Sequence, residues 1–413
     1  MQHPKMKYTY VGIDSHKDTH TAVFLDCFFD KLGEIEFNNL PSEFGAFLSE
    51  AEKLRQDGTE LLFGLEDTSC YGRSLMMFLK NNDQPVKHVN PLLVARERRN
   101  RNMLEKTDSV DAECAARVLL SKLGTLPDAA PEDEYWVLRT LVIRRDFIVR
   151  NNVALKNHLH DLLTQHYPNY RRFFHHIDCD SSLAFFYEYP SPSALERTTF
   201  EGLTALLWEH SRGQFGEKKA KQIWDSREDT AVPFQEVRDD AVRSTIRQLR
   251  FNLAELEQAE KSLATFLPTF ETTLTTMNGI SVIIASQLLS CIGDIKKFST
   301  PAKLARYAGV APVTYASGKN ALQFANQRGN RELNSIFFKL ALRLSFPSGK
   351  SGTVVNPFFY EYYNKKLSDG KTKRQALKCV QRRLVNIVWT MLTHGEEYVN
   401  PPTYEVEKKA VGA

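Results

Sequence analysis

The stretch Tyr8-Thr-Tyr-Val-Gly-Ile-Asp14, followed after a short link by Thr19-His-Thr-Ala-Val-Phe-Leu-Asp26, decides the fold of the N-terminal part of the chain. Both stretches are rich in β-branched and aromatic residues, and the short link predicts a β-hairpin. The segments that follow alternate in character: strands are predicted at 35–37, 61–66 and 86–89, and helices at 42–54, at 75–79 and from Ser109 onward. This alternation predicts an α/β layer structure for the first part of the chain.

Composition excludes several classes of protein. Of the 413 residues, 42% are hydrophobic and 25% are charged, which excludes a wholly disordered or collagen-like chain. The six cysteines show no Cys-x-x-Cys spacing, so neither a zinc knuckle nor a disulfide framework is expected. No signal peptide and no long apolar run is present, so we expect a cytoplasmic protein that has no membrane contact. The net charge of +4 says little about partners.

The middle of the chain has a different pattern. Apolar residues follow a 3-4 alternation in two stretches: Leu138, Leu141, Ile148, Leu155, Leu159 and Leu162, and then Ile246, Leu249, Leu253, Leu256, Leu263 and Leu267. Arg145, Asn152 and Glu260 interrupt the two apolar series. The pattern predicts two long helices that pair as a coiled coil, within one chain or between chains. An ordinary antiparallel helical hairpin fits the pattern equally well. The segment 167–233 between the helices reads as an irregular helical insertion.

Four acidic residues stand out in the N-terminal part. Asp14 and Glu66 each end a predicted strand, and Asp108 and Asp111 lie three residues apart at the start of a predicted helix, on one face of it. Carboxylates that converge repel one another unless a cation holds them, and Mg²⁺ prefers oxygen ligands. Taken singly, Asp14 can close a turn and Asp108 can cap a helix. A phosphate loop at Asp14 is disfavoured because the turn 15–18 contains no glycine.

Basic residues flank these acids and fill the C-terminal third, which is otherwise predicted to be mostly helical. A charge run is usually a solvated surface, but Lys and Arg also bind phosphate backbones. We therefore expect nucleic-acid contacts from Arg96, Arg99, Arg101, Lys106, Lys319, Arg328, Arg331, Lys371, Lys373, Arg374, Lys378 and Arg382. Residues 315–319, Tyr-Ala-Ser-Gly-Lys, read as a short turn that carries a hydroxyl, a signal of little specificity by itself.

Several motifs together resemble a known family. They occur in this order: Tyr10-Val-Gly-Ile-Asp14-Ser-His-Lys17, Leu65-Glu66-Asp-Thr68-Ser-Cys-Tyr71, Lys106-Thr-Asp108-Ser-Val-Asp111-Ala112, Gly279-Ile280, Leu304-Ala-Arg-Tyr-Ala-Gly309, Tyr315-Ala-Ser317-Gly318 and Arg328-Gly329-Asn330. This set resembles the DEDD transposases of the insertion-sequence one-ten family, which are related to the pilin-gene inverting recombinases. The resemblance covers both ends of the chain and matches residues 135–270 loosely.

The resemblance implies a domain organisation. It implies an RNase H-type, RuvC-like domain over residues 1–128, a helical coiled-coil region with an insertion over 129–270, a transposase domain over 271–405, and a tail over 406–413. The expected fold class is thus α/β followed by all-α.

The resemblance also implies a reaction and its participants. Asp14, Glu66, Asp108 and Asp111 correspond to the family's Mg²⁺-binding acids, and Ser317 corresponds to its nucleophile. The family recombines target and donor DNA through a transient serine–DNA bond. A structured non-coding guide RNA directs it, and its homo-oligomers, dimers or tetramers, share composite sites.

Two other functions compete with this one. A RuvC-like junction-resolving nuclease would use the same acids and a water nucleophile, with Ser317 as a turn residue only. A nucleic-acid-binding scaffold would keep the fold and bind without cleaving.

Overall fold

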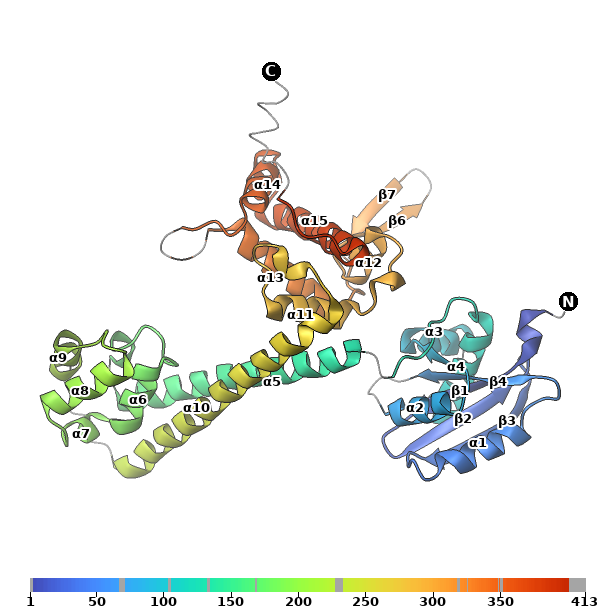
Figure 1. The fold of residues 1–413 in the computed structure, drawn as a ribbon, viewed down its shortest axis with the longest axis horizontal. Coiled ribbons are helices and arrows are strands. Elements are labelled where there is room, and N and C mark those ends of the chain that lie inside the picture. Colours follow the sequence, from blue (N-terminus) through green and yellow to red (C-terminus); the bar gives the residue numbers. More distant parts are fainter. Residues whose placement is uncertain are drawn as a thin grey trace, which may run out of the picture. The chain divides into compact units, whose positions relative to one another are not determined.

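The computed structural model describes residues 3–66, 71–102, 105–131, 134–167, 169–226, 233–317, 320–324, 326–347, 349 and 352–400. The chain divides into two compact units, Met1–Asp133 and Glu134–Ala413 (Figure 1). Short 3-10 turns accompany the longer elements at Pro4–Lys7, Tyr170–Arg172, Leu267–Phe270, Leu274–Thr276 and Ile295–Lys297.

The first unit is built on a mixed five-stranded sheet in the order β3-β2-β1-β4-β5. β1 pairs with β2 in antiparallel orientation and with β4 in parallel orientation. The strands are β1 (Tyr8–Ser15), β2 (Thr19–Leu25), β3 (Lys31–Asn38), β4 (Glu60–Glu66) and β5 (Val86–Val89), and the helices are α1 (Phe44–Lys53), α2 (Arg73–Asn81), α3 (Pro91–Asn100) and α4 (Asp108–Ser121). The predicted hairpin and α/β layers are therefore confirmed.

Helices cover both faces of this sheet, and the strand period of two decides which residues meet which helices. Val11 and Ile13 of β1 belong to the apolar core shared with α1 and α2. Tyr10 belongs to the core on the opposite face, which is made with α3 and α4. Residues 10, 12 and 14 of β1 consequently face α4.

Two glycines permit α4 to pack closely on the sheet. A Cβ atom on Gly12 would lie 2.2 Å from the Ala112 carbonyl oxygen and 2.2 Å from the Ala116 amide nitrogen, both in α4. Gly64, the register partner of Gly12 on β4, lies under Leu119 of the same helix. The helix backbone therefore rests on the strand backbone at Gly12, where no side chain fits between them.

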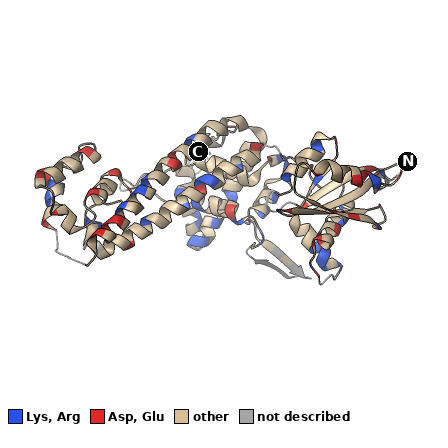
Figure 2. Cartoon of the chain, turned by 90° about the horizontal axis from the view of Figure 1, so that it is seen from below, with Lys and Arg blue, Asp and Glu red and all other residues tan. Residues whose placement is uncertain are grey.

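In the second unit, two long helices, α5 (Glu134–His166) and α10 (Gln235–Phe266), pack against each other within the chain (Figure 1). Both helices carry basic and acidic residues along their length (Figure 2). The two helices thus form a pair inside one chain, and their description as a coiled coil stays a prediction.

The polar residues that interrupt the apolar series behave differently from one another. Arg145 donates hydrogen bonds of 2.9 and 3.0 Å to Glu260 across the helix pair. Asn152 is buried, and its amide nitrogen and oxygen have no hydrogen-bond partner among the described residues. Arg145 therefore has a hydrogen-bonding partner on α10, whereas Asn152 has none among the described residues.

The insertion between the long helices forms its own aromatic core. Its helices are α6 (Asp180–Glu188), α7 (Pro192–Leu195), α8 (Phe200–His210) and α9 (Glu217–Asp225). Phe173, Phe185 and Phe186 pack there against the end of α5 and the beginning of α10. The insertion read from the sequence is thus a small helical bundle.

The C-terminal part is mostly helical, as predicted, with one hairpin added. Its elements are α11 (Val282–Ile292), α12 (Pro301–Tyr307), β6 (Val313–Ser317), β7 (Asn320–Phe324), α13 (Arg331–Ser345), α14 (Pro357–Ser368) and α15 (Lys373–His394). Its helices share one apolar core with Leu138 and Val142 of α5, Leu263 of α10 and Leu267 of the 3-10 turn after α10. The division of residues 129–405 into two domains stays a prediction. None of the described helices has an apolar stretch of the length needed to traverse a bilayer.

We expect Gly12→Ala to destabilise the first unit, because the new methyl group meets helix backbone that cannot move aside. Overpacking of this kind costs typically ~1–3 kcal/mol. The matched control is Gly45→Ala in α1, where an added Cβ meets nothing within 4 Å, and where alanine stabilises a helix by roughly 0.5–1 kcal/mol relative to glycine. Urea unfolding followed by circular dichroism measures both. Equal stability of the two variants would refute the close-packing argument.

Candidate active site

The acids of the first unit lie at one edge of the sheet. Asp14 on β1 and Glu66 on β4 are register partners in neighbouring parallel strands, two residues beyond the paired glycines. Because side chains alternate along a strand, both acids lie on the face that α4 covers. Asp14 is buried, and Glu66 is half-buried.

The beginning of α4 supplies the other two acids. Thr107 caps the helix through a 3.2 Å hydrogen bond from the Val110 amide to its hydroxyl. Asp108 is the first helical residue and is exposed, whereas Asp111, one turn later, is buried. The positive end of the helix dipole favours acids at these positions.

His16 links the two groups of acids. Its Nε2 atom lies 3.1 Å from Asp14 Oδ2 and 3.1 Å from Asp108 Oδ1. Asp14, His16 and Asp108 form a candidate metal-binding group, since one ligand atom of each lies within 4.8 Å of the others. A single imidazole nitrogen therefore lies at the position from which a cation can contact both carboxylates.

The electrostatics show four acids crowded together. Burial, followed by the negative charges of Asp14 and Asp111, raises the pKa of Glu66 to about 7. Burial also raises the pKa of Asp14, with Asp111 and Asp108 adding to the rise and His16 opposing it. Burial alone would lower the pKa of His16, but the carboxylates of Asp14 and Asp108 raise it overall.

Two observations indicate that this site fits a divalent metal ion. Glu66 Oε2 is buried and has no hydrogen-bond partner among the described residues. The donor set is made of carboxylate oxygens and one imidazole nitrogen, which are ligands for hard and borderline divalent cations. A positive ion bound among these groups would offset their mutual repulsion and supply Glu66 with a partner.

Sequence reasoning missed two residues of this site. His16 lies in the turn 15–18, and the absence of glycine from this turn was used above only to argue against a phosphate loop. Nothing in the local sequence pattern links His16 to Asp108. Arg98 of α3 forms an ion pair with Asp111. For His16, its position two residues after Asp14 was an available signal. The pairing of Arg98 depends on how α3 packs against α4.

Ser317 lies in the second unit, as the last residue of β6 and the register partner of Asn320. Its side chain, and residues 318–319 including Lys319, lie outside the described part of the chain. The interpretation of residues 315–319 as a turn was wrong for Tyr315–Ser317, which are strand. Threonine and tyrosine, which occur there next to each other, are common in β-strands.

The predicted nucleic-acid-binding residues fall into two sets. On the first unit Arg96, Arg99 and Lys106 are exposed, while Arg101 forms a 2.8 Å ion pair with Glu113. On the second unit Arg328, Arg331, Lys371, Lys373 and Arg374 are exposed. Lys378 Nζ donates to the Gly309 carbonyl at 3.3 Å, and Arg382 donates to the Pro301 carbonyl at 3.1 Å. Neither side chain forms an ion pair with an acid among the described residues, and burial, followed by the charge of Arg374, lowers the pKa of Lys378.

Comparison with known proteins defines the class. A family model described as a transposase, of the DEDD IS110 type, matches residues 11–168, which include the four acids. A second model, described as "Transposase IS116/IS110/IS902 family", matches residues 271–352, which include Ser317. Both units therefore carry transposase sequence.

Similar proteins extend along most of the chain. The "Insertion element IS116 uncharacterized 44.8 kDa protein" of Streptomyces clavuligerus is 26% identical over 93% of this chain and 94% of its own length. The "Pilin gene-inverting protein" of Moraxella bovis is 27% identical over 95% and 98%. An insertion element IS110 protein of Streptomyces coelicolor is 27% identical over 71% and 72%. The chain belongs to the IS110 family of insertion-sequence transposases and recombinases.

We expect Glu66→Gln to stabilise the metal-free protein at pH 8. The folded-state pKa of Glu66, about 7, lies above its ordinary value, so the native state binds more protons than the unfolded state between pH 4.5 and 7. Stability then falls as pH rises through this window. Glutamine does not ionise, so the variant does not lose this stability, and its midpoint temperature of unfolding should be higher by roughly 2–4 °C. Thermal unfolding in EDTA at pH 8 and pH 4.5 measures the effect.

The comparison between the two pH values is the control. Near pH 4.5 the carboxyl of Glu66 is largely protonated in the folded protein, so the two proteins should unfold at similar temperatures. A stabilisation that is the same at both pH values would show that the substitution acts through packing and not through charge.

Proposed function

We propose that this protein is a DNA transposase that cleaves and exchanges strands with a serine nucleophile and a Mg²⁺ site of four carboxylates. The observation that carries the proposal is the convergence of Asp14, Glu66, Asp108 and Asp111 on one edge of the sheet, with a buried Glu66 oxygen that has no hydrogen-bond partner in the described part of the chain. The strand order, with β2 antiparallel to a parallel β1, β4 and β5, supports an RNase H-type, RuvC-like domain.

The residues of the site would divide the work as follows. Asp14, Glu66, Asp108 and Asp111 would hold Mg²⁺, which neutralises charge on a phosphodiester when bound. Arg98 holds the carboxylate of Asp111 in place through their ion pair. His16 would keep Asp14 and Asp108 together in the metal-free protein and release them as the site fills.

The serine step belongs to the second unit. The Ser317 oxygen would form a bond to a backbone phosphorus while one phosphorus–oxygen bond of the DNA breaks. The hydroxyl proton then ends on the departing sugar oxygen. Because the acids and the serine lie in separate units, we propose that the site is composite and that a homo-oligomer, a dimer or tetramer, completes it.

Sequence recognition would come from nucleic acid and not from the protein alone. The exposed arginines and lysines on both units suit contacts to phosphate backbones, which fix position without reading sequence. We propose that a structured non-coding RNA pairs with target and donor DNA and that the protein holds these duplexes.

We expect Asp14→Asn and Ser317→Ala each to reduce strand exchange by at least 100-fold, because each removes a group that the chemistry requires. The assay uses purified full-length protein, element DNA with its flanking non-coding RNA, and Mg²⁺. Denaturing gels detect the protein–DNA adduct. The adduct should vanish with Ser317→Ala, and EDTA should abolish all cleavage.

The matched controls are Asp18→Asn, an exposed acid in the turn between β1 and β2, and Ser368→Ala, an exposed serine of the second unit. Both should retain full activity. Clean hydrolysis that survives Ser317→Ala would replace the transposase mechanism with that of a junction-resolving nuclease. Salt-dependent binding with no cleavage, even for the unaltered protein, would indicate a scaffold.

A further inference from the structure

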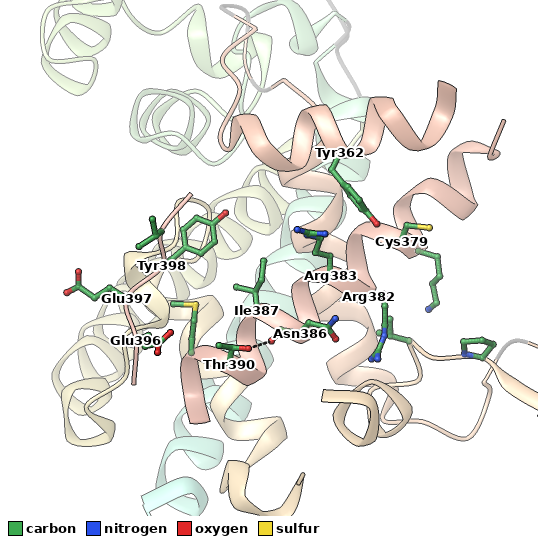
Figure 3. A pocket seen from close by; sticks show the side chains of 15 residues that line it. Tyr362, Cys379, Arg382, Arg383, Asn386, Ile387, Thr390, Glu396, Glu397 and Tyr398 are labelled. Carbon is green, nitrogen blue, oxygen red and sulfur yellow. Dashed lines mark hydrogen bonds between the residues drawn. The ribbon is translucent and has the colours of Figure 1, made fainter. Parts of the chain in front are cut away.

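A cavity of about 770 Å³ lies on the C-terminal part of the second unit (Figure 3). α15 forms its floor with Asn386, Ile387, Thr390 and Met391. α14 contributes Tyr362 to one wall. The segment 395–400, called the strap here, forms the opposite wall with Glu396, Glu397, Tyr398 and Val399.

The strap is held firmly in place. Thr273 donates a 2.7 Å hydrogen bond to the Glu396 carbonyl, and the Tyr398 amide donates a 2.9 Å hydrogen bond to the Thr276 hydroxyl. The Asn356 amide nitrogen lies 3.4 Å from the Tyr398 hydroxyl oxygen, a further hydrogen bond. The wall therefore exists before any ligand binds.

The two ends of the cavity have opposite charge. Lys378, Arg382 and Arg383 line one end, and none of them forms an ion pair with an acid of the described residues. Arg383 instead lies over the rings of Phe358 and Tyr362, 4.9 and 5.4 Å from their centroids. Glu396 and Glu397 line the other end (Figure 3). The apolar floor of Ile387 and Met391 separates the two ends.

A second cavity, of about 960 Å³, adjoins the first. The two share Val310, Pro312 and Lys378 as lining residues. Arg331 and Arg374 also line the second cavity, and none of the described residues that line it is acidic. It lies where α13 and α15 begin, at the base of the β6–β7 hairpin. Phosphate groups suit this combination of helix N-termini and cations that form no ion pair among the described residues.

We propose that an unpaired nucleotide of a bound nucleic acid inserts its base into the first cavity while the adjoining phosphates lie in the second. This rests on the proposed function only in requiring that the protein binds nucleic acid. The phosphate flanking the base would contact Lys378 and Arg382, where the two cavities meet.

The first cavity is suited to a nucleotide base and not to an acidic peptide. Its volume lies in the range of small-ligand sites, and Tyr398 offers a ring for stacking, which favours any base. Asn386 can pair with a base edge, and a glutamate accepts from an exocyclic amino group such as that of cytosine. An acidic peptide would be repelled by Glu396 and Glu397. Cations at one end and acceptors at the other match a nucleotide.

The proposal also gives the hairpin a role. Pro312 and Asn326, on either side of β6 and β7, line the phosphate cavity. A nucleic-acid strand that is held through one extruded base would therefore lie in a fixed position beside the β6–β7 hairpin, which carries Ser317. The cavity would act as a positioning site for the strand and would take no part in the bond changes.

The test uses full-length protein and DNA hairpins of one sequence, either fully paired or with a single bulged cytosine, and the same pair in RNA. Fluorescence anisotropy should show about tenfold tighter binding of the bulged form in DNA, in RNA or in both, and the arm that shows the preference identifies the source. Thr390→Phe places a ring in the cavity and should abolish the preference. Thr393→Phe, exposed and outside the cavity, should keep it.

Equal affinity for bulged and paired hairpins in both DNA and RNA would overturn the proposal, as would a preference that survives Thr390→Phe. Circular dichroism checks folding. If Thr390→Phe does not fold, Glu396→Gln is the second variant, and it is tested on hairpins with a bulged cytosine or a bulged thymine. It should reduce the preference for cytosine, and an unchanged preference overturns the proposal. Strand cleavage of element DNA is measured in parallel. A protein that cleaves normally without any bulge preference refutes the cavity proposal and leaves the proposed function standing.

Discussion

The first unit depends on one close contact, where the backbone of α4 rests on β1 at Gly12. With no side chain between them, the carbonyl of Ala112 and the amide of Ala116 approach the strand more closely than any other residue type would allow. Gly64, its register partner on β4, leaves room for the side chains of Leu119 and Val89. Each glycine precedes an acid by two residues, so the contact that fixes the helix also fixes which carboxylates lie beside its first turn.

The same contact sets the electrostatic character of the site. Among the described residues, His16 and Arg98 form the ion pairs of these four carboxylates. Burial, followed by the repulsion between the carboxylates, raises the pKa values of Glu66 and Asp14. Natural proteins accept such local cost where function requires it. The close packing beneath the cluster supplies the rigidity that holds these charges together.

Much of this could be predicted from the sequence, because strand ends and helix starts are local features. The β1–β2 hairpin, the strand ending at Glu66 and the helix carrying Asp108 and Asp111 all followed from residue type and spacing. The partners of His16 and Arg98 did not, since they depend on how α3 and α4 pack on the sheet. The interpretation of residues 315–317 as a turn failed because β6 is only five residues long, which leaves few positions to show the alternation of a strand. The cavity between α14, α15 and the strap combines segments that no local pattern connects.

The strap has a practical consequence for anyone who handles this protein. Three hydrogen bonds attach it to Thr273, Thr276 and Asn356. A protein shortened before Glu396 would lose these contacts together with one wall of the first cavity, so an expression fragment made for crystallisation should extend through residue 400.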